Sequence, residues 1–288
     1  MKIYIVIPAY NETGTITEAL NSIVTQTQLP DKLVLVNDNS TDDTGSIMID
    51  YAKEFDWIEH VDRTSAGEHL PGAKVIEAFN TGLSTLDKDY DIICKFDADI
   101  VFPEDYIARL RKMFEDDPVL GIAGGIPYIK NNGQWVFERI ASKDHVRGPI
   151  KAYRKACFRD IGGLRRSVGW DTIDVLLAQY HGWKVRTDKD LHVRHLKPTG
   201  MNYQPKARYL QGKALYKMRY GIVLSTIALI KGALARGSIM FFIYGLAGFL
   251  KAFISNESFL ITKVEGHFFR GLRWKNIRLK LNPIRKTN

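Results

Sequence analysis

The stretch "DYDIICKFDADIVFP", residues 89–103, decides the fold prediction. Its apolar residues 92–94 lead into Asp97 and Asp99, and apolar residues resume at Ile100. In an extended chain alternate residues point the same way, so Asp97 and Asp99 are expected to face one spot. Two carboxylates at one place repel each other unless a cation or a proton lies between them. The stretch therefore predicts a buried strand that ends in an acidic site.

The segments before this strand predict the rest of the sheet. Short β-rich runs at residues 3–7, 32–36 and 57–61 alternate with three segments of helical spacing. The apolar residues of those helical segments are Ile16, Leu20, Ile23 and Val24, then Ile47, Tyr51 and Phe55, then Val75, Ala78, Phe79, Leu83 and Leu86. Short apolar strands that alternate with amphipathic helices indicate an α/β fold with a mainly parallel sheet covered on both faces.

Polar residues follow three of the predicted strands. The segment "PAYNE" (8–12) follows the first, "NDNS" (37–40) the second and "DAD" (97–99) the fourth. Ligands of open α/β sheets bind outside the carboxyl ends of the strands. Mg²⁺ and Mn²⁺ take oxygen ligands, typically one or two carboxylates plus substrate phosphates. Residues 97–99 are therefore predicted to hold a metal ion that binds a diphosphate; a solvated turn that closes the strand is the alternative.

Length and composition indicate a globular protein with one large domain, or one domain plus an appendage. The chain has 288 residues, of which 45% are hydrophobic and 25% charged. Cys94 and Cys157 form neither a disulfide framework nor a metal spacing, so buried reduced thiols are expected. The N-terminal apolar run is too short for a signal peptide. The longest apolar run, residues 238–250, is shorter than the roughly 20 residues of a bilayer span.

Charge is distributed unevenly along the chain. Residues 201–288 contain 16 Lys and Arg against two acids, whereas residues 1–200 carry a net charge of −5. We therefore expect two domains, with residues 201–288 as a mostly helical, basic extension. Amphipathic helices on an anionic membrane surface are the favoured interpretation of this extension. Packing against the N-terminal domain or a second subunit is the alternative, and no nucleic-acid partner is expected.

Several motifs occur in the order and spacing of a known family. They are "IPAYNE" (7–12), "VNDNSTDDT" (36–44), "GAKVIEAFNTGL" (72–83), "KFDADI" (95–100) and "GGLRRSVGWDTIDVLLAQYHGWKV" (162–185). Together they resemble the nucleotide-sugar-binding half of the family 2 glycosyltransferases, and the resemblance covers about residues 1–200. It implies a Rossmann-like GT-A domain that transfers a sugar with inversion. The implied donor is a nucleoside-diphosphate sugar, preferably a UDP-sugar, and the implied cofactor is Mn²⁺ or Mg²⁺.

The resemblance also implies roles for individual residues. Asp38 would accept a hydrogen bond from the base, Asp97 would approach the ribose or the metal shell, and Lys74 would meet the phosphates. The metal ligands would be Asp99 and a histidine, preferably His195. His192 is the alternative ligand, a solvated helix face is the alternative for Lys74, and turn packing is the alternative for Tyr10. The implied nucleotide-sugar-binding set is Pro8, Ala9, Tyr10, Glu12, Asp38, Lys74, Asp97 and Ala98.

A catalytic base is implied by a further spacing of the family. Family members carry an Asp, usually preceded by Glu, 11 residues before a Gly-aromatic pair. Counting back from Gly182 gives Asp171, although Trp170 stands where the family usually has an acid. A positioned carboxylate can take the proton of an acceptor hydroxyl. Asp174 is a nearby competitor, and a helix N-cap is the structural alternative for Asp171.

The expected enzyme adds a single sugar. Processive family members carry Gln-x-x-Arg-Trp, whereas this chain has Arg270 in the position of Gln. We expect a cytoplasmic enzyme at the inner face of the membrane, with a lipid-linked or cell-surface glycan precursor as acceptor. The sequence does not decide whether the protein forms a homo-oligomer. A sugar nucleotidyltransferase would carry a Gly-rich loop after the first strand, and "PAYNE" has no Gly. A non-catalytic scaffold is the other alternative, although the acids at the predicted site are present.

Overall fold

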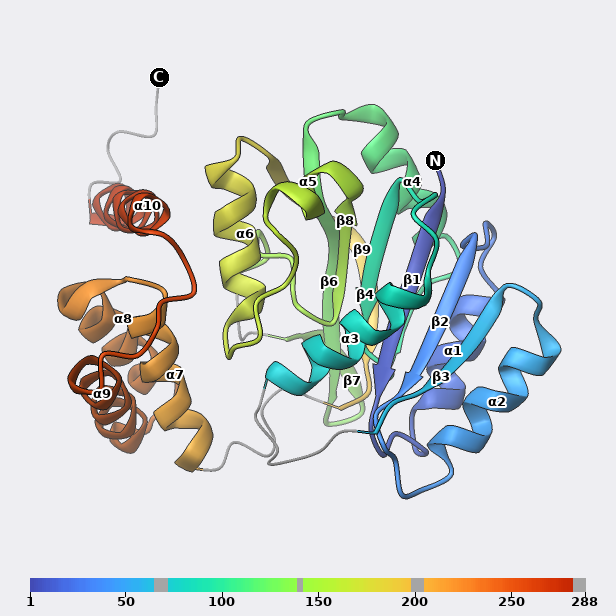
Figure 1. The fold of residues 1–288 in the computed structure, drawn as a ribbon, viewed down its shortest axis with the longest axis horizontal. Helices are drawn as coiled ribbons and strands as arrows, with labels where there is room; N and C mark the ends of the chain where they lie inside the picture. The colour runs from blue at the N-terminus through green and yellow to red at the C-terminus, as the bar shows by residue number, and fades with distance from the viewer. Residues whose placement is uncertain (65–71, 139–141, 198–204, 282–288) are drawn as a thin grey trace. The chain divides into compact units, whose positions relative to one another are not determined.

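The computed structural model describes residues 1–64, 72–138, 142–197 and 205–281 (Figure 1). The chain divides into two compact units. The first unit comprises Met1–Arg166 and His181–Met201, and the second comprises Ser167–Tyr180 and Asn202–Asn288. Residues 167–180 were expected in the N-terminal domain, but they group with the C-terminal helices.

The first part of the chain follows the predicted order of strands and helices. The elements are β1 (Ile3–Ala9), α1 (Ile16–Val24), β2 (Lys32–Asn37), α2 (Thr44–Glu54), β3 (Ile58–Asp62), α3 (Ala73–Thr85) and β4 (Ile92–Phe96). Strands β3, β2, β1 and β4 lie side by side and run parallel. The α/β class and the β-α-β-α-β-α-β order are therefore confirmed.

The remaining strands extend the sheet and make it mixed. The further elements of this unit are β5 (Ile100–Val101), α4 (Tyr106–Asp116), β6 (Leu120–Asn131), β7 (Gln134–Phe137), β8 (Ile150–Arg154), α5 (Lys155–Asp160) and β9 (Lys184–His195). The strand order is β3-β2-β1-β4-β8-β6-β9-β5, with β7 paired to β6. Strand β8 is antiparallel to β4 and β6, whereas β9 is parallel to β6. Strand β9 thereby ends beside the acidic residues that follow β4.

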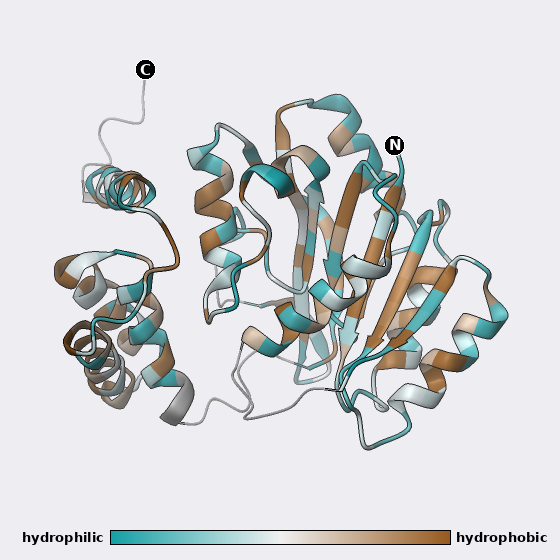
Figure 2. Ribbon diagram, viewed as in Figure 1, coloured by the Kyte–Doolittle hydropathy of each residue, from teal (hydrophilic) through white to brown (hydrophobic). Residues whose placement is uncertain are grey.

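Helices cover both faces of the sheet, as predicted (Figure 1). The residues of β1 that face one side, such as Ile5, share a core with α1, α2 and α4. On the other side α3 approaches the strands closely at Gly82. A Cβ atom there would lie 2.6 Å from a Val36 methyl and 2.7 Å from a Val6 methyl, so only glycine permits this approach. Figure 2 shows hydrophobic residues along β1, β2 and β4, consistent with strands that are buried on both faces.

The second unit is entirely helical in the part of the chain that the structure describes. It contains α6 (Trp170–Tyr180), α7 (Pro205–Lys217), α8 (Gly221–Arg236), α9 (Ile239–Ile254) and α10 (Lys263–Leu281). Helices α7 and α9 cross at glycines: a Cβ atom on Gly212 would lie 1.6 Å from the Gly245 carbonyl oxygen. Helix α6 joins this unit because the Tyr180 ring packs on the Phe268 ring of α10, with centroids 5.5 Å apart. The predicted helical extension is therefore present.

Candidate functional site

Two loops at the carboxyl ends of β1 and β2 are tied together by hydrogen bonds. The backbone N–H of Asn11 donates to Ser40 Oγ (3.1 Å), and the N–H of Thr41 donates to Asn11 Oδ1 (2.8 Å). The N–H of Glu12 donates to Thr44 Oγ1 (2.7 Å). Asn11 has a φ of 54°, a left-handed conformation that Asn tolerates better than most residues. The motifs "PAYNE" and "NDNSTDDT" therefore form one continuous surface.

Asp42 fixes this pair of loops. Its carboxylate accepts hydrogen bonds from the Thr44 hydroxyl (2.6 Å), the Thr44 N–H (3.0 Å) and the Thr13 N–H (3.3 Å). Burial of the carboxyl raises its pKa, but these hydrogen bonds outweigh burial and lower the pKa of Asp42 to about 2. The loop surface is therefore held by a carboxylate that stays ionised at physiological pH.

Asp38 lies at the end of β2 and is paired with an arginine. Arg63 donates one guanidinium nitrogen to Asp38 Oδ1 and the other to Glu77 Oε2 (2.6 Å). Arg166 also forms an ion pair with Glu77. The backbone N–H of Arg63 donates to the carbonyl of Asn37 (2.9 Å), which holds this arginine beside the end of β2. Asp38 is thus buried and charge-balanced at the place predicted for the nucleotide base.

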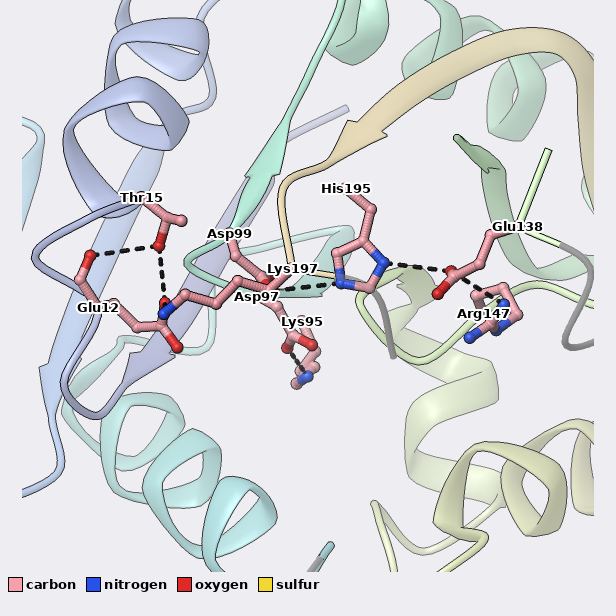
Figure 3. Close-up of polar contacts among 9 residues, drawn as sticks. All are labelled: Glu12, Thr15, Lys95, Asp97, Asp99, Glu138, Arg147, His195 and Lys197. Atoms are coloured by element: carbon pink, nitrogen blue, oxygen red, sulfur yellow. Dashed lines mark hydrogen bonds and ion pairs between the residues drawn. The ribbon is translucent and has the colours of Figure 1, made fainter. Parts of the chain in front are cut away.

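The two carboxylates of "DAD" have separate cationic partners (Figure 3). Asp97 forms an ion pair with Lys95, a buried residue of β4. Asp99 Oδ2 lies 3.3 Å from Nε2 of His195. Residues 98 and 99 form a turn and do not continue the strand, so the expected alternation of an extended chain does not apply to them. The repulsion between two adjacent acids is therefore relieved by one protein cation for each.

The position of His195 beside Asp99 follows from strand pairing. In the β5–β9 ladder Ile100 is opposite His195, and the N–H of Leu196 donates to the carbonyl of Asp99 (2.9 Å). His195 is buried, and its Nδ1 lies 3.2 Å from Oε2 of Glu138. Of the two predicted histidines, the structure therefore places His195 beside the acidic turn.

His192 has a different environment. It is exposed on β9, and its ring lies 4.3 Å from the ring of Tyr128, centroid to centroid. Its Nε2 lies 3.0 Å from the carbonyl oxygen of Lys189. These contacts identify His192 as part of the outer surface of the sheet.

Glu12 connects the first loop to the segment after β9. Its Oε2 accepts hydrogen bonds from the Thr15 hydroxyl (2.7 Å) and from Lys197 Nζ (2.6 Å), as Figure 3 shows. Lys197 was not predicted as a site residue. It adds positive charge at the edge where a nucleoside diphosphate was expected.

The other predicted nucleotide-binding residues lie at the ends of the same strands or on α3. Pro8 and Ala9 are buried at the end of β1, and Ala98 is buried in the acidic turn. Tyr10 is half exposed, which leaves its ring available to a ligand. Lys74 is partly buried in the first turn of α3.

Asp171 lies in the first turn of α6, within the second unit. The carbonyl of Gly169 accepts bonds from the N–H groups of Thr172 (2.9 Å) and Ile173 (3.1 Å), so Gly169 is the residue that caps the start of α6. Asp171 is therefore inside the first turn and is not the N-cap. Its charge is still favourable there, because the N-terminal end of a helix stabilises anions. The buried Asp174 accepts a bond from the N–H of Val175 (2.6 Å).

Comparison with known proteins identifies the family. The sequence model of glycosyl transferase family 2 matches residues 4–163, more than half of the chain. The chain belongs to this family. The match contains the loops after β1 and β2 and the acidic turn of the first unit.

Two curated bacterial proteins are similar to parts of this chain. Poly-beta-1,6-N-acetyl-D-glucosamine synthase of Staphylococcus epidermidis is 23% identical over 218 residues, which cover 69% of this chain and 47% of that protein. Glycosyltransferase GlyA of Streptococcus pneumoniae is 28% identical over 137 residues, which cover 47% of this chain and 18% of that protein. This chain therefore spans less than half the length of either relative.

Solved structures confirm the GT-A fold of this family member. Staphylococcus aureus TarS 1–349 in complex with UDP-GlcNAc has a TM-score of 0.63 at 16% identity, covering 88% of this chain and 81% of that chain. The mannosyltransferase PcManGT of Pyrobaculum calidifontis, in complex with GDP-Man and Mn²⁺, has a TM-score of 0.57 at 16% identity. That match covers 100% of this chain and 88% of PcManGT. Identity at this level establishes the fold alone.

The acidic turn and the end of β9 each offer one group to a divalent metal. Among the residues with described positions, no three His, Cys, Asp or Glu side chains are grouped to hold a metal ion. Asp99 and His195 converge, however, and offer one carboxylate and one imidazole. Mn²⁺ accepts both ligand types. When the protein supplies so few ligands, phosphate oxygens of the substrate complete the coordination shell of the metal ion. The residues present therefore fit a metal that binds together with the diphosphate.

The protonation of His195 opposes metal binding at neutral pH. Burial of the imidazole lowers its pKa, but hydrogen bonds and ion pairs with Asp99 and Glu138 outweigh burial and raise the pKa of His195 to about 9. In the absence of metal, these ion pairs stabilise the folded protein fully below pH 6.5, and the contribution is lost as the pH rises through about 9. A metal ion on Nε2 has to displace this proton.

We therefore predict that the affinity for Mn²⁺ rises with pH. In the presence of UDP, the affinity should increase by up to about tenfold per pH unit between about pH 6.5 and 8.5, because one proton leaves His195 for each ion bound. Calorimetric titration in buffers of different ionisation enthalpy measures both the affinity and the released proton. The variant His195→Gln is the control and should show a flat profile; a flat profile in the wild type would contradict the prediction.

Several residues of the site were missed by the sequence analysis. One of them had a visible indication: Lys95 is the only charged residue within the apolar run of β4, and a buried lysine is expected to have an anionic partner. Arg63, Glu138 and Arg147 belong to no recognisable motif. Their positions depend on strand pairing, which a single sequence does not reveal.

Proposed function

We propose that this chain transfers one sugar from a nucleoside-diphosphate sugar to a hydroxyl group of an acceptor, with inversion and with Mn²⁺ or Mg²⁺ bound. The pairing of Asp99 with His195 beside the two nucleotide loops carries the proposal. Membership of glycosyl transferase family 2 supports it. The solved relatives contain UDP-GlcNAc or GDP-Man, and we favour a UDP-sugar for this chain.

In the proposed reaction the acceptor oxygen forms a bond to the anomeric carbon while the bond from that carbon to the diphosphate breaks. Asp171 takes the proton of the acceptor hydroxyl as the general base. Asp38 accepts a hydrogen bond from the base of the nucleotide. Asp99 and His195 would hold the metal ion, which neutralises the charge of the diphosphate leaving group. Lys197, which is paired with Glu12, adds positive charge beside the diphosphate leaving group.

Thermal denaturation with a panel of nucleotides tests this function. UDP and UDP-sugars with Mn²⁺ should raise the melting temperature, because a ligand that binds only the folded state stabilises it. The panel should include GDP-sugars, EDTA controls, and UTP with a sugar 1-phosphate as the substrates of a sugar nucleotidyltransferase. Stabilisation by the last pair alone would favour nucleotidyl transfer, and no stabilisation by any nucleotide would favour a non-catalytic scaffold.

The helical unit suggests where the enzyme works. Helix α9 presents apolar side chains to solvent at Ile239, Phe253 and Ile254, which are 67%, 63% and 80% exposed. Lys251, in the last turn of the same helix, is also exposed. No helix within the described residues has both the length and the apolar character to span a bilayer. These features support a cytoplasmic enzyme that lies on the inner, anionic face of the membrane, with a lipid-linked glycan precursor as acceptor.

We predict that the protein sediments with anionic vesicles, less with neutral vesicles, and is partly released by high salt. Each Lys or Arg near an anionic leaflet contributes about 1 kcal/mol, and this contribution is screened by salt. The triple variant Ile239→Ser, Phe253→Ser, Ile254→Ser should lose the salt-resistant fraction, because that fraction depends on apolar insertion. Sedimentation followed by gel quantification measures both fractions.

The matched control is Val119→Ser, which changes a residue of the first unit that is 48% exposed. It should sediment like the wild type. A truncation near residue 205 is less informative, because it removes α10, against which α6 packs. Absence of sedimentation at any lipid charge, together with a dimer in solution, would favour subunit packing as the role of α9.

A further inference from the structure

We propose that Glu138 is a positioning residue that holds His195 in the orientation needed to bind the metal ion, with Arg147 balancing the charge of Glu138. The inference rests on the proposed metal-dependent function. It assigns a role to two residues outside the family motifs.

Strand pairing fixes the backbone of Glu138 against β6, on the opposite edge of β6 from β9. Glu138 directly follows β7, and its N–H donates to the carbonyl of Pro127 in β6 (3.1 Å). In the β6–β9 ladder Pro127 is opposite Val193, and Ile129 is opposite His195. The carboxylate of Glu138 therefore approaches the imidazole from the side opposite to Asp99, as Figure 3 shows.

The contacts of Glu138 select one ring nitrogen of His195 for the metal. Oε2 of Glu138 lies 3.2 Å from Nδ1 of His195, and Nε2 lies 3.3 Å from Asp99. Both ring nitrogens face carboxylates, and an ionised carboxylate can only accept a hydrogen bond. Once a metal ion takes the place of the proton on Nε2, the neutral imidazole keeps its proton on Nδ1, where Glu138 accepts it. The lone pair is then on Nε2, the nitrogen that faces the acidic turn. Such carboxylate–histidine pairs fix the tautomer and the ring orientation of metal ligands.

Glu138, Arg147 and His195 form a buried cluster, and its burial indicates that it has a specific role. Glu138 is 1% exposed and Arg147 is 7% exposed, and Nη1 of Arg147 lies 3.2 Å from the same oxygen of Glu138. A buried ion pair often stabilises a fold no better than apolar residues of the same size. The cluster is therefore better explained by the orientation it gives His195 than by stability alone.

Calorimetric titration of Mn²⁺ in the presence of UDP tests the role of Glu138. Glu138→Gln keeps the shape of the side chain and removes its charge, and should weaken Mn²⁺ binding by about 10- to 100-fold, as for other residues that support a metal ligand. The matched control is Asp188→Asn on β9, the strand of His195, which removes one charge of the ion pair between Asp188 and Arg109 of α4. Its affinity for Mn²⁺ should be unchanged, even if its melting temperature falls.

A double-mutant cycle separates orientation of His195 from general support of the fold. In a His195→Ala background, which leaves the contact between Glu138 and Arg147 in place, Glu138→Gln should cause no further loss of Mn²⁺ affinity. If Glu138→Gln does not fold, the double variant Glu138→Gln, Arg147→Met removes both charges and should show the 10- to 100-fold loss of Mn²⁺ affinity expected for Glu138→Gln.

The outcomes distinguish this inference from the proposed function. UDP binding by the wild type that does not depend on Mn²⁺ would overturn the proposed metal use and the role of Glu138 with it. Metal-dependent binding that Glu138→Gln leaves unchanged would overturn the role of Glu138 alone. A loss of affinity that persists in the His195→Ala background would likewise show that Glu138 does not act through His195.

Discussion

Asp171→Asn is expected to reduce turnover by about 10²-fold or more while the affinity for the donor stays unchanged. The amide cannot take the proton of the acceptor hydroxyl, but it has nearly the same size as the carboxylate. Asp171 lies at the start of α6 and in a different compact unit from the loops after β1 and β2, which are proposed to bind the nucleotide. Donor binding by the first unit should therefore not depend on the charge of Asp171. Steady-state kinetics and calorimetry with the donor measure the two effects separately.

Asp174→Asn is the control for this variant. Asp174 is buried and accepts a bond from a backbone N–H of its own helix, so the substitution should affect stability more than turnover. If Asp171→Asn retained near-full turnover and Asp174→Asn lost it, the catalytic base would be Asp174.

Asp99→Asn is expected to weaken Mn²⁺-dependent binding of UDP by about 10²-fold, because it removes the anionic oxygen offered to the metal and the partner of His195. EDTA should produce the same loss in the wild type. Titration calorimetry with and without Mn²⁺ measures both effects. Equal affinity under the two conditions would refute metal-dependent donor binding.

Asp97→Asn is a matched control in the same turn. Asp97 is paired with the buried Lys95, whereas Asp99 is paired with His195. Asp97→Asn should therefore leave more of the Mn²⁺ dependence intact than Asp99→Asn does. Identical losses would indicate that both carboxylates bind the metal.

The first half of the sheet could be predicted because its strands are short apolar runs and the helices between them have a clear helical spacing of hydrophobic residues. Strand β9 was missed because its sequence is rich in charge, so the choice between its two histidines rested on the resemblance to the family alone. Leu191, Val193 and His195 nevertheless alternate as buried residues between exposed ones, a pattern typical of a half-buried strand. Recognising that alternation would have indicated which histidine points inward.

The acids of the site could be predicted, but their partners could not. Asp38, Asp97 and Asp99 follow strands directly, so local sequence indicates their place. Lys95 pairs with Asp97 within one segment, whereas Arg63 and Glu138 reach the site from other segments. Contacts of this kind depend on the register between strands far apart in the sequence, and one sequence contains no direct information about that register.

The packing of α6 on α10 has a consequence for synthesis of the chain. Helix α6 ends at Tyr180, and α10 begins at Lys263, about 80 residues later. At about 5–20 residues per second, a ribosome needs roughly 4–17 s to add the intervening residues. During that interval Asp171 is on a nascent segment without its final neighbours, while the strands on either side of that segment can already pair. The helix that carries the proposed base is therefore expected to be among the last parts of the protein to mature.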